Sequence, residues 1–246
     1  MLIRDVCPRC QSPKYKKNGH IHNGKHNHHC HDCGRQCVQC CEQYLISEDK
    51  RSLIERLLVE RISLRGICRA VGVTLKWLLG FLVQCCEALP DHLHVQPVSC
   101  QHDVLIQRLE VEAEELASFV QTKAHKPWVW IALDTKTRQI LAFHVGDRSP
   151  TSAEHLWATS PHAYRQHATF YTDQYVVYDK IIPAAQHRAI SKLARKTNHI
   201  ERCNNTLRQR VSRLVRAALS FSKKLANHIG AMKLFICHYN LTRAAA

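Results

Sequence analysis

A single carboxylate stands within a basic tract near the C-terminal end of the sequence. Between Arg188 and Lys224 there are eleven lysine or arginine residues, and Glu201 is the only acid. A solvated charged helix normally mixes both signs, because opposite charges three or four residues apart support it. A carboxylate among cations instead suits a divalent metal held where a polyanion also docks. The pattern favours metal-dependent chemistry on nucleic acid; the alternative is an ion pair of Glu201 with Arg202 or Arg208 on a DNA-binding helix.

Two C-x-x-C pairs form a second group of residues with clear chemistry. Cys7 and Cys10 make one pair and Cys30 and Cys33 the other, with nineteen residues between the pairs. Each pair places two thiolates on a tight turn, so the four can complete a closed tetrahedral shell for a structural Zn²⁺ ion. The segment between the pairs is polar and cannot form much of a core. Metal binding would therefore supply most of the folding energy of this module.

Other soft ligands lie close to these cysteines in the sequence. Competing thiolates come from Cys37, Cys40 and Cys41, and competing imidazoles come from His20, His22, His26, His28 and His29. We interpret the histidine-rich segment as a solvated, weakly basic loop rather than as a set of ligands.

Composition limits the class of protein. The chain has 246 residues, enough for one mid-sized domain and one or two small ones. Its formal net charge of +15 indicates a polyanionic partner. There is no run of about 18 apolar residues and no apolar leader at the start, so we expect a cytoplasmic protein that works at nucleic acid. Its thirteen cysteines are an odd number in a long chain, which favours reduced thiols over a disulfide framework.

Residues 43–89 have helical periodicity. Gly72 is expected to end one short helix and Thr74 to cap the next. A short helix, a glycine turn and a second helix are typical of a helix-turn-helix, although any small helical bundle can produce the pattern. We expect three basic side chains of this segment to contact DNA: Arg65, Arg69 and Lys76.

The C-terminal part of the sequence predicts a mixed sheet with helices. A proline-broken linker at 90–103 follows an N-terminal zinc-binding module at 1–42 and the helical segment, and a domain at 104–246 follows the linker. In this domain we expect strands at 109–120, 128–133, 139–145 and 168–173, and helices at 151–160, 198–216 and 222–239. The fold class is therefore α+β or α/β. Acids on the first strand, at the end of the fourth strand and on a late helix are the arrangement of an RNase H-like nuclease domain, where three carboxylates hold two divalent ions.

At this point the chain resembles a known family, the IS1-type insertion sequence transposases of the DDE class. The cysteine pairs resemble the family's zinc ribbon, and residues 62–69 resemble its helix-turn-helix. The most specific matches are Tyr171-Thr172-Asp173 with Tyr178, the stretch 196–202, and the stretch 219–224. The resemblance implies an RNase H-like catalytic domain in which Asp173 is the second catalytic acid and Glu201 the third.

The first catalytic acid is where the sequence departs from the family pattern. The family has Asp-Glu-Leu-Trp-Ser-Phe-Val, whereas residues 114–120 here are Glu-Glu-Leu-Ala-Ser-Phe-Val. Glu114 thus stands in place of an aspartate and Ala117 in place of a tryptophan, and Cys203 replaces a usual aromatic residue. A glutamate keeps the charge but moves it outward by one methylene, which can spoil a two-metal site whose ions lie about 3.5–4 Å apart.

Three interpretations of the first position stay open. Glu114 is the preferred ligand, Asp134 is a possible substitute, and a damaged site is the third. Asp134 lies at a hairpin turn, where aspartate commonly binds the backbone. Glu112 lies on the same strand face as Glu114 and could serve as a spare ligand.

The resemblance implies a prokaryotic, nucleoid-associated transposase. It would bind double-stranded DNA at terminal inverted repeats, cut and join strands with Mg²⁺ or Mn²⁺, and act as a homodimer or higher oligomer on DNA, with no membrane partner. Two rivals are a catalytically impaired relic that only occupies element ends, and a nuclease or resolvase that cuts without joining. Five arginines are expected to bind phosphates: Arg202, Arg208, Arg210, Arg213 and Arg216.

Overall fold

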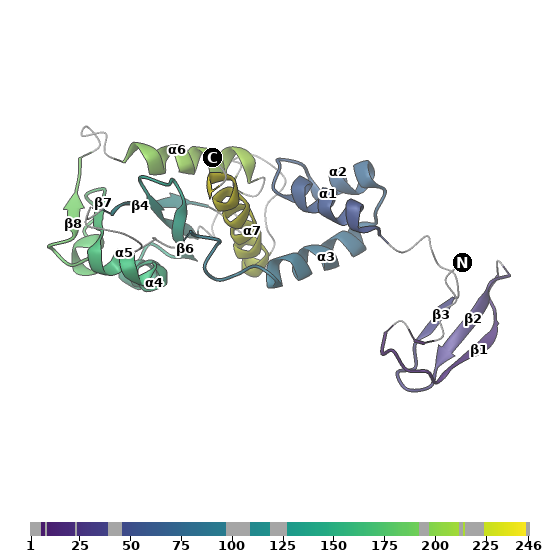
Figure 1. Cartoon of the computed structure of the whole chain (residues 1–246). Helices are drawn as coiled ribbons and strands as arrows, with labels where there is room; N and C mark the ends of the chain where they lie inside the picture. Colours follow the sequence, from purple (N-terminus) through teal and green to yellow (C-terminus); the bar gives the residue numbers. More distant parts are fainter. Residues whose placement is uncertain are drawn as a thin grey trace. The chain divides into compact units, whose positions relative to one another are not determined.

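The structure is a computed structural model that describes residues 6–7, 9–22, 24–38, 46–96, 109–118, 127–191, 197–211, 214 and 224–244. Contacts divide the chain into two compact units, Met1–Ser52 and Leu53–Ala246 (Figure 1). The division falls within helix α1 (Glu48–Leu58). Each unit is described by itself below.

The first unit contains a three-stranded antiparallel sheet in the order β1-β2-β3. Its strands are β1 (Tyr15–His20), β2 (His26–Cys30) and β3 (Gln36–Val38). The expected histidine loop is therefore wrong, because His20 lies in β1 and three further histidines lie in β2. His20, His22 and His26 are exposed, as expected of solvated residues. His28 is buried and its ring stacks on Tyr15 with the centroids 4.8 Å apart. Ring contacts across the strands replace the apolar alternation that normally identifies a strand, so hydrophobic periodicity gave no signal.

Three helices open the second unit: the C-terminal part of α1, then α2 (Leu64–Val71) and α3 (Leu75–Glu87). Gly72 ends α2 with a positive φ of 73°, a conformation that glycine adopts without steric cost. The hydroxyl oxygen of Ser63 accepts from the backbone N–H of Gly66, and that of Thr74 accepts from the N–H of Trp77. Both predictions, that Gly72 ends one helix and Thr74 caps the next, are confirmed.

A five-stranded mixed sheet forms the centre of the second unit. Its strands are β4 (Glu110–Ala117), β5 (Trp128–Asp134), β6 (Ile140–Gly146), β7 (Thr169–Thr172) and β8 (His187–Ala189). The strand order is β6-β5-β4-β7-β8; β5 is antiparallel to both β4 and β6, whereas β7 is parallel to both β4 and β8. The expected hairpin and first strand are confirmed, and the short strand β8 was not predicted.

Helices cover both faces of this sheet (Figure 1). On one face lie α6 (Asn198–Arg210) and α7 (Leu225–Ala244); on the other lie α4 (Pro150–Thr159), α5 (His162–His167) and the short 3₁₀ helix η2 (Tyr178–Lys180). Two hydrophobic clusters fill the layers, one containing Leu116, Ile131, Leu207 and Phe235 and the other Trp130, Leu156 and Phe170. Alternate residues of β4 therefore face different helices, which decides the surroundings of each acid on that strand.

Some helix boundaries differ from the expected ones. Helix α4 begins at Pro150 rather than at residue 151, and its cap is Ser149, whose hydroxyl accepts from the N–H of Ser152. Helix α6 ends at Arg210, and α7 extends to Ala244. No single described helix is both long and apolar enough to cross a membrane, and α2 and α3 meet that test only as a pair bent by 112°.

The first part of the expected linker packs against α7. The side-chain amide N–H of Asn240 donates to the carbonyl of Leu93 at 2.8 Å, and Lys233 Nζ lies 2.7 Å from Asp91 Oδ1. Residues 97–103 lie outside the described part of the chain, and the expected domain boundaries stay predictions.

Candidate functional site

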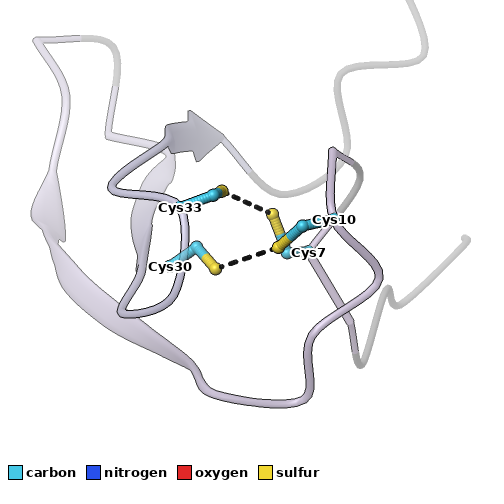
Figure 2. Close-up of side chains that lie close together, drawn as sticks. All are labelled: Cys7, Cys10, Cys30 and Cys33. Atoms are coloured by element: carbon cyan, nitrogen blue, oxygen red, sulfur yellow. Dashed lines mark hydrogen bonds between the residues drawn. The ribbon is translucent and has the colours of Figure 1, made fainter.

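The four predicted zinc ligands meet in the first unit. Their Sγ atoms all lie within 4.8 Å of one another, and Cys7–Cys33 and Cys10–Cys30 are separated by 3.6 and 3.5 Å (Figure 2). Zn–S bonds of about 2.3 Å at tetrahedral angles place the sulfurs roughly 3.8 Å apart, so the observed spacing fits a zinc ion. The competing thiol Cys37 lies 3.1 Å from the Tyr15 hydroxyl and is not part of the group, while Cys40 and Cys41 lie outside the described residues.

The surroundings of the cysteines favour at least one thiolate. Backbone N–H groups of Cys10 and Arg9 lower the pKa of the Cys7 thiol to about 6. The Ser12 N–H also lowers the pKa of Cys10, but burial and the neighbouring thiols outweigh it and raise that pKa overall. Because zinc binds the thiolate, a cysteine that ionises readily beside three others is suited to recruit the metal.

In the second unit, the sheet register brings Glu114 and Asp173 to neighbouring positions. Ala113 of β4 pairs with Thr172 of the parallel strand β7, so the next residues along the two strands are Glu114 and Asp173. Residues in register on adjacent strands point to the same face of a sheet. Glu114 faces α6, and the register brings Asp173, just beyond the end of β7, next to Glu114, where its charge acts on the Glu114 carboxyl.

Two hydrogen bonds join the first two turns of α6 to strand β4. The backbone N–H of Ile200 donates to Glu112 Oε2 at 2.7 Å, and the side-chain N–H of Asn204 donates to Glu114 Oε2 at 2.8 Å. Thr197, the residue before the helix, provides no side-chain cap. Glu112 therefore caps the positive end of α6 from β4, and in doing so it holds Glu201 near Glu114.

The other two predicted catalytic acids act on the charge of Glu114. Burial, followed by the negative charges of Glu201, Asp173 and Glu115, raises the pKa of Glu114 to about 7. Like charges gathered around a half-buried carboxyl are typical of a site that a cation completes. Their ligand atoms are not as close as the thiolates, however: among the described residues only the four cysteines bring three or more ligand atoms within 4.8 Å.

Asp173 is held by its neighbours in the loop after β7. The backbone N–H of Tyr175 donates to Asp173 Oδ1 at 3.0 Å, and the Thr172 hydroxyl donates to the Asp173 carbonyl at 2.8 Å. Nε2 of His187 on β8 lies 2.7 Å from the same hydroxyl, and its Nδ1 lies 3.1 Å from Asp179 Oδ1. This chain of contacts fixes the backbone that carries the second acid.

The opposite face of β4 carries a separate polar network. Arg148 donates through Nε and Nη2 to Glu115 Oε1 at 2.9 and 2.6 Å, and the Tyr178 hydroxyl donates to Glu115 Oε2 at 3.1 Å. The Arg148 guanidinium also lies over the rings of Trp128 and Tyr175. Glu115 is therefore paired with Arg148 on its own face, which leaves Glu114 as the acid of this pair that faces α6.

Two residues considered as alternative ligands have structural partners. The Asp134 carboxylate accepts from the backbone N–H groups of Lys136 and Thr137 and from the Thr137 hydroxyl, so it binds the β5–β6 turn. Glu112 is occupied by the N-terminus of α6. The structure therefore gives Glu114 no competitor from Asp134 or Glu112 at the first position.

The predicted DNA-binding residues have different surroundings. Arg65, Arg69, Lys76 and Arg202 are exposed. Arg210 instead pairs with Glu60, and its guanidinium lies over Phe235. Glu201 is exposed on α6. Arg213 and Arg216 lie outside the described residues.

Comparison with known proteins decides the family. The model of the IS1 transposase family matches residues 108–240, which carry all three acids. The chain belongs to the IS1 transposase family. This IS1-family chain is 34% identical over 125 residues to the insertion element iso-IS1n protein InsB of Shigella dysenteriae, a match that covers 51% of this chain and 92% of that protein. It is 33% identical over 117 residues to the insertion element IS1 protein InsB of Shigella flexneri, covering 48% and 86%.

A solved structure matches the IS1-family chain more distantly. A chain in the cryo-EM structure of a simian T-cell lymphotropic virus intasome with the PP2A regulatory subunit B56 gamma aligns with a TM-score of 0.37 and 11% identity, covering 74% of this chain and 66% of that one. Similarity at this level supports no inference about the IS1-family chain.

Sequence reasoning missed four partners of the acids in this IS1-family chain: the Glu112 cap, Asn204, Arg148 and His187. One signal was present, because two consecutive acids on a buried strand face opposite sides and each needs its own partner. Which distant residues supply those partners depends on tertiary contacts that no local pattern encodes.

Proposed function

We propose that this protein is an insertion sequence transposase that binds terminal inverted repeats and catalyses metal-dependent DNA cleavage and strand transfer. The proposal is supported by the register that brings Asp173 next to Glu114, by the negative charge of Glu201 acting on Glu114, and by membership of the IS1 transposase family. Carboxylate oxygens are the ligands that Mg²⁺ and Mn²⁺ prefer, so the donor set fits a divalent ion.

We infer that the second unit has an RNase H-like catalytic core. Its support is the strand order β6-β5-β4-β7-β8, with three antiparallel strands followed by parallel β7 and β8. The acids lie on the central strand β4, after its neighbour β7, and on a helix that covers the same face, which is the arrangement expected for that core.

We assign recognition of the element ends to the cysteine module and to α2 and α3. Helices α2 and α3 are bent by 112° around the three residues 72–74, geometry typical of a helix-turn-helix. Arg65, Arg69 and Lys76 are exposed on these helices and can reach DNA bases or phosphates. The four cysteines would hold a structural zinc that keeps the sheet of the first unit folded.

In the proposed reaction, a divalent ion would activate a water or a 3′-hydroxyl and stabilise the leaving oxygen of the phosphodiester. The residues of the chain have separate tasks. Glu114, Asp173 and Glu201 would hold the ion, and Glu112 fixes the helix that carries Glu201. Arg202 and Arg208 are proposed to bind DNA phosphates near the site, and two copies of the chain would hold the paired element ends.

Cleavage and joining of end DNA test the proposal. Wild-type protein would be compared with Glu201→Gln and Glu114→Asp in Mg²⁺ and in Mn²⁺, with Glu154→Gln, an exposed acid on α4, as the matched control. We expect wild-type and Glu154→Gln to form strand-transfer products and Glu201→Gln to lose at least 100-fold in rate, because a misplaced catalytic group alone costs about that much.

The other outcomes identify the rivals. End binding without cleavage, restored by Glu114→Asp, would show a relic damaged at the first acid. Nicked ends without joined products would show a nuclease or resolvase.

A further inference from the structure

Asn204 is a buried polar residue next to the candidate carboxylate site. It lies on α6 three residues after Glu201, on the adjacent helical turn, and its side chain is only 5% exposed. Its Nδ2 group donates to Glu114 Oε2 at 2.8 Å. An ionised carboxylate oxygen can only accept, so when Glu114 is ionised the amide presents Nδ2 to it.

The other end of this amide is unsatisfied by the protein. Asn204 Oδ1 is buried and has no hydrogen-bond partner among the described residues. A buried polar atom without a partner costs about 1–3 kcal/mol and usually indicates an ion, a water or a functional role. With a cation bound, the carboxylates nearby are ionised and can only accept, so they cannot satisfy a carbonyl oxygen. A hard divalent cation or a water bound to it can, because amide oxygens are among its ordinary ligands.

Asn204 also bears on the unusual glutamate at the first position. Glu114 is one methylene longer than the aspartate of the family pattern, and an unrestrained longer side chain would place its oxygens variably. The contact with Asn204 holds Oε2 on α6, the helix that also carries Glu201. The extra length of Glu114 is thus used to reach the helix, and Oε1 is left for the cation.

We propose that Asn204 is the fourth residue of the carboxylate site, where its Nδ2 positions Glu114 and its Oδ1 serves the divalent cation, directly or through a bound water. This inference rests on the proposed function, because it requires that the three acids bind a metal. It makes Asn204 a positioning residue and a metal-site residue that no sequence pattern indicated.

The test is the Mn²⁺ affinity of the zinc-loaded full chain, measured by electron paramagnetic resonance titration. Asn204→Ala is compared with Asn205→Ala, the same residue type at the next position on α6 but exposed. Loss of such a supporting residue typically weakens metal affinity by about 10–100-fold, so we expect at least about a 10-fold loss for Asn204→Ala and none for Asn205→Ala. Equal Mn²⁺ affinity in Asn204→Ala and wild-type protein would overturn the proposal.

A double-mutant cycle with Glu114→Asp separates positioning from general stability. The shorter aspartate does not reach Asn204, so the loss caused by Asn204→Ala should be smaller in the Glu114→Asp background than in the wild-type background. The same loss in both backgrounds would show that Asn204 acts independently of Glu114, contrary to the proposal.

If Asn204→Ala fails to fold, the isosteric Asn204→Asp replaces it. This variant keeps an oxygen for the cation but lacks the N–H donor. It should bind Mn²⁺ at least as tightly as wild-type yet cleave end DNA more slowly, and wild-type cleavage by this variant would contradict the proposal.

One arm of the same titration reports on the proposed function itself. Glu201→Gln should lose Mn²⁺ affinity whether or not Asn204 takes part. If wild-type protein binds Mn²⁺ no better than Glu201→Gln does, the carboxylate site fails as a whole. If only Glu201→Gln loses affinity, the site stands and the role of Asn204 is wrong.

Discussion

The cysteine site and the carboxylate site differ in how the chain assembles them. The cysteines come from two turns only 26 residues apart at their extremes, and their sulfurs lie within 4.8 Å of one another. The acids come from three elements, and the contacts that bring α6 to β4 join residues 88 and 90 positions apart. A site built from local turns is encoded in the spacing of its ligands, whereas a site built across a sheet depends on strand register and on residues that hold the helix in place.

The largest expected effect is the loss of folding of the first unit when the cysteine site is broken. Cys30→Ser removes a buried ligand, and a structural zinc in a small module contributes on the order of 10 kcal/mol to its folding. We expect loss of bound zinc and of amide protection in β1–β3, while the unfolding transition of the second unit is retained. Zinc analysis and hydrogen exchange on the full chain measure both, with Cys68→Ser on α2 as the control. Protected strands in a zinc-free protein would contradict the metal-dependent folding of this module.

A moderate loss of stability is expected when the contact between β4 and the start of α6 is removed. Glu112→Ala leaves the buried N–H of Ile200 without its acceptor, which costs about 1–3 kcal/mol of stability. Glu112→Gln keeps an acceptor, so its stability should be closer to that of the wild-type protein. Burial already raises the pKa of Glu112 and disfavours its charge, so loss of the charge costs little. Urea unfolding and exchange of the Ile200 amide measure the difference. Equal stability of the two variants would show that Glu112 does not cap the helix.

The smallest effect is a pH dependence that differs in sign between the two sites. The pKa of Glu114 rises from an ordinary 4.5 to about 7 in the folded protein, so the folded state binds this proton more tightly than the unfolded state does. Stability without added divalent ions should therefore fall as pH rises from about 4.5 to 7, and Mg²⁺ should reduce that fall. The cysteine site should instead lose zinc as pH falls, because protons compete for the thiolates.

Thermal unfolding of wild-type and Glu114→Gln at a series of pH values isolates the contribution of Glu114. Glutamine cannot titrate, so the difference between the two melting temperatures should change between pH 4.5 and 7 and stay constant above that range. A constant difference throughout would mean that Glu114 keeps its ordinary pKa.

The same contrast explains what could be predicted from the sequence. The C-x-x-C pairs indicated the zinc ligands, and Gly72 and Thr74 indicated the break between α2 and α3, because each signal lies within a few residues. The hairpin of β5 and β6 followed from apolar runs around the Asp134 turn. The acids themselves were named through the resemblance to the IS1 family.

The remaining features depend on distant contacts. The histidine strand β2 lacks apolar alternation, and it is held by ring stacking on Tyr15 and by the adjacent cysteines. Arg148 is 33 residues from Glu115, and no sequence pattern near either residue predicts that they pair. Asn204 follows Glu201 by three residues, a spacing that places both on one side of α6, but only the structure connects it with Glu114.

Whether Glu114, Asp173 and Glu201 share one metal is tested most directly by metal-directed cleavage of the protein backbone. Fe²⁺ can replace Mg²⁺ at oxygen-ligand sites, and with ascorbate and peroxide it generates radicals that cut the backbone near the bound ion. In the zinc-loaded full chain, a shared metal predicts cuts close to all three residues, competed by Mg²⁺ and lost together in Glu201→Gln. Cuts near only one of them, or cuts unchanged in Glu201→Gln, would contradict a shared metal site.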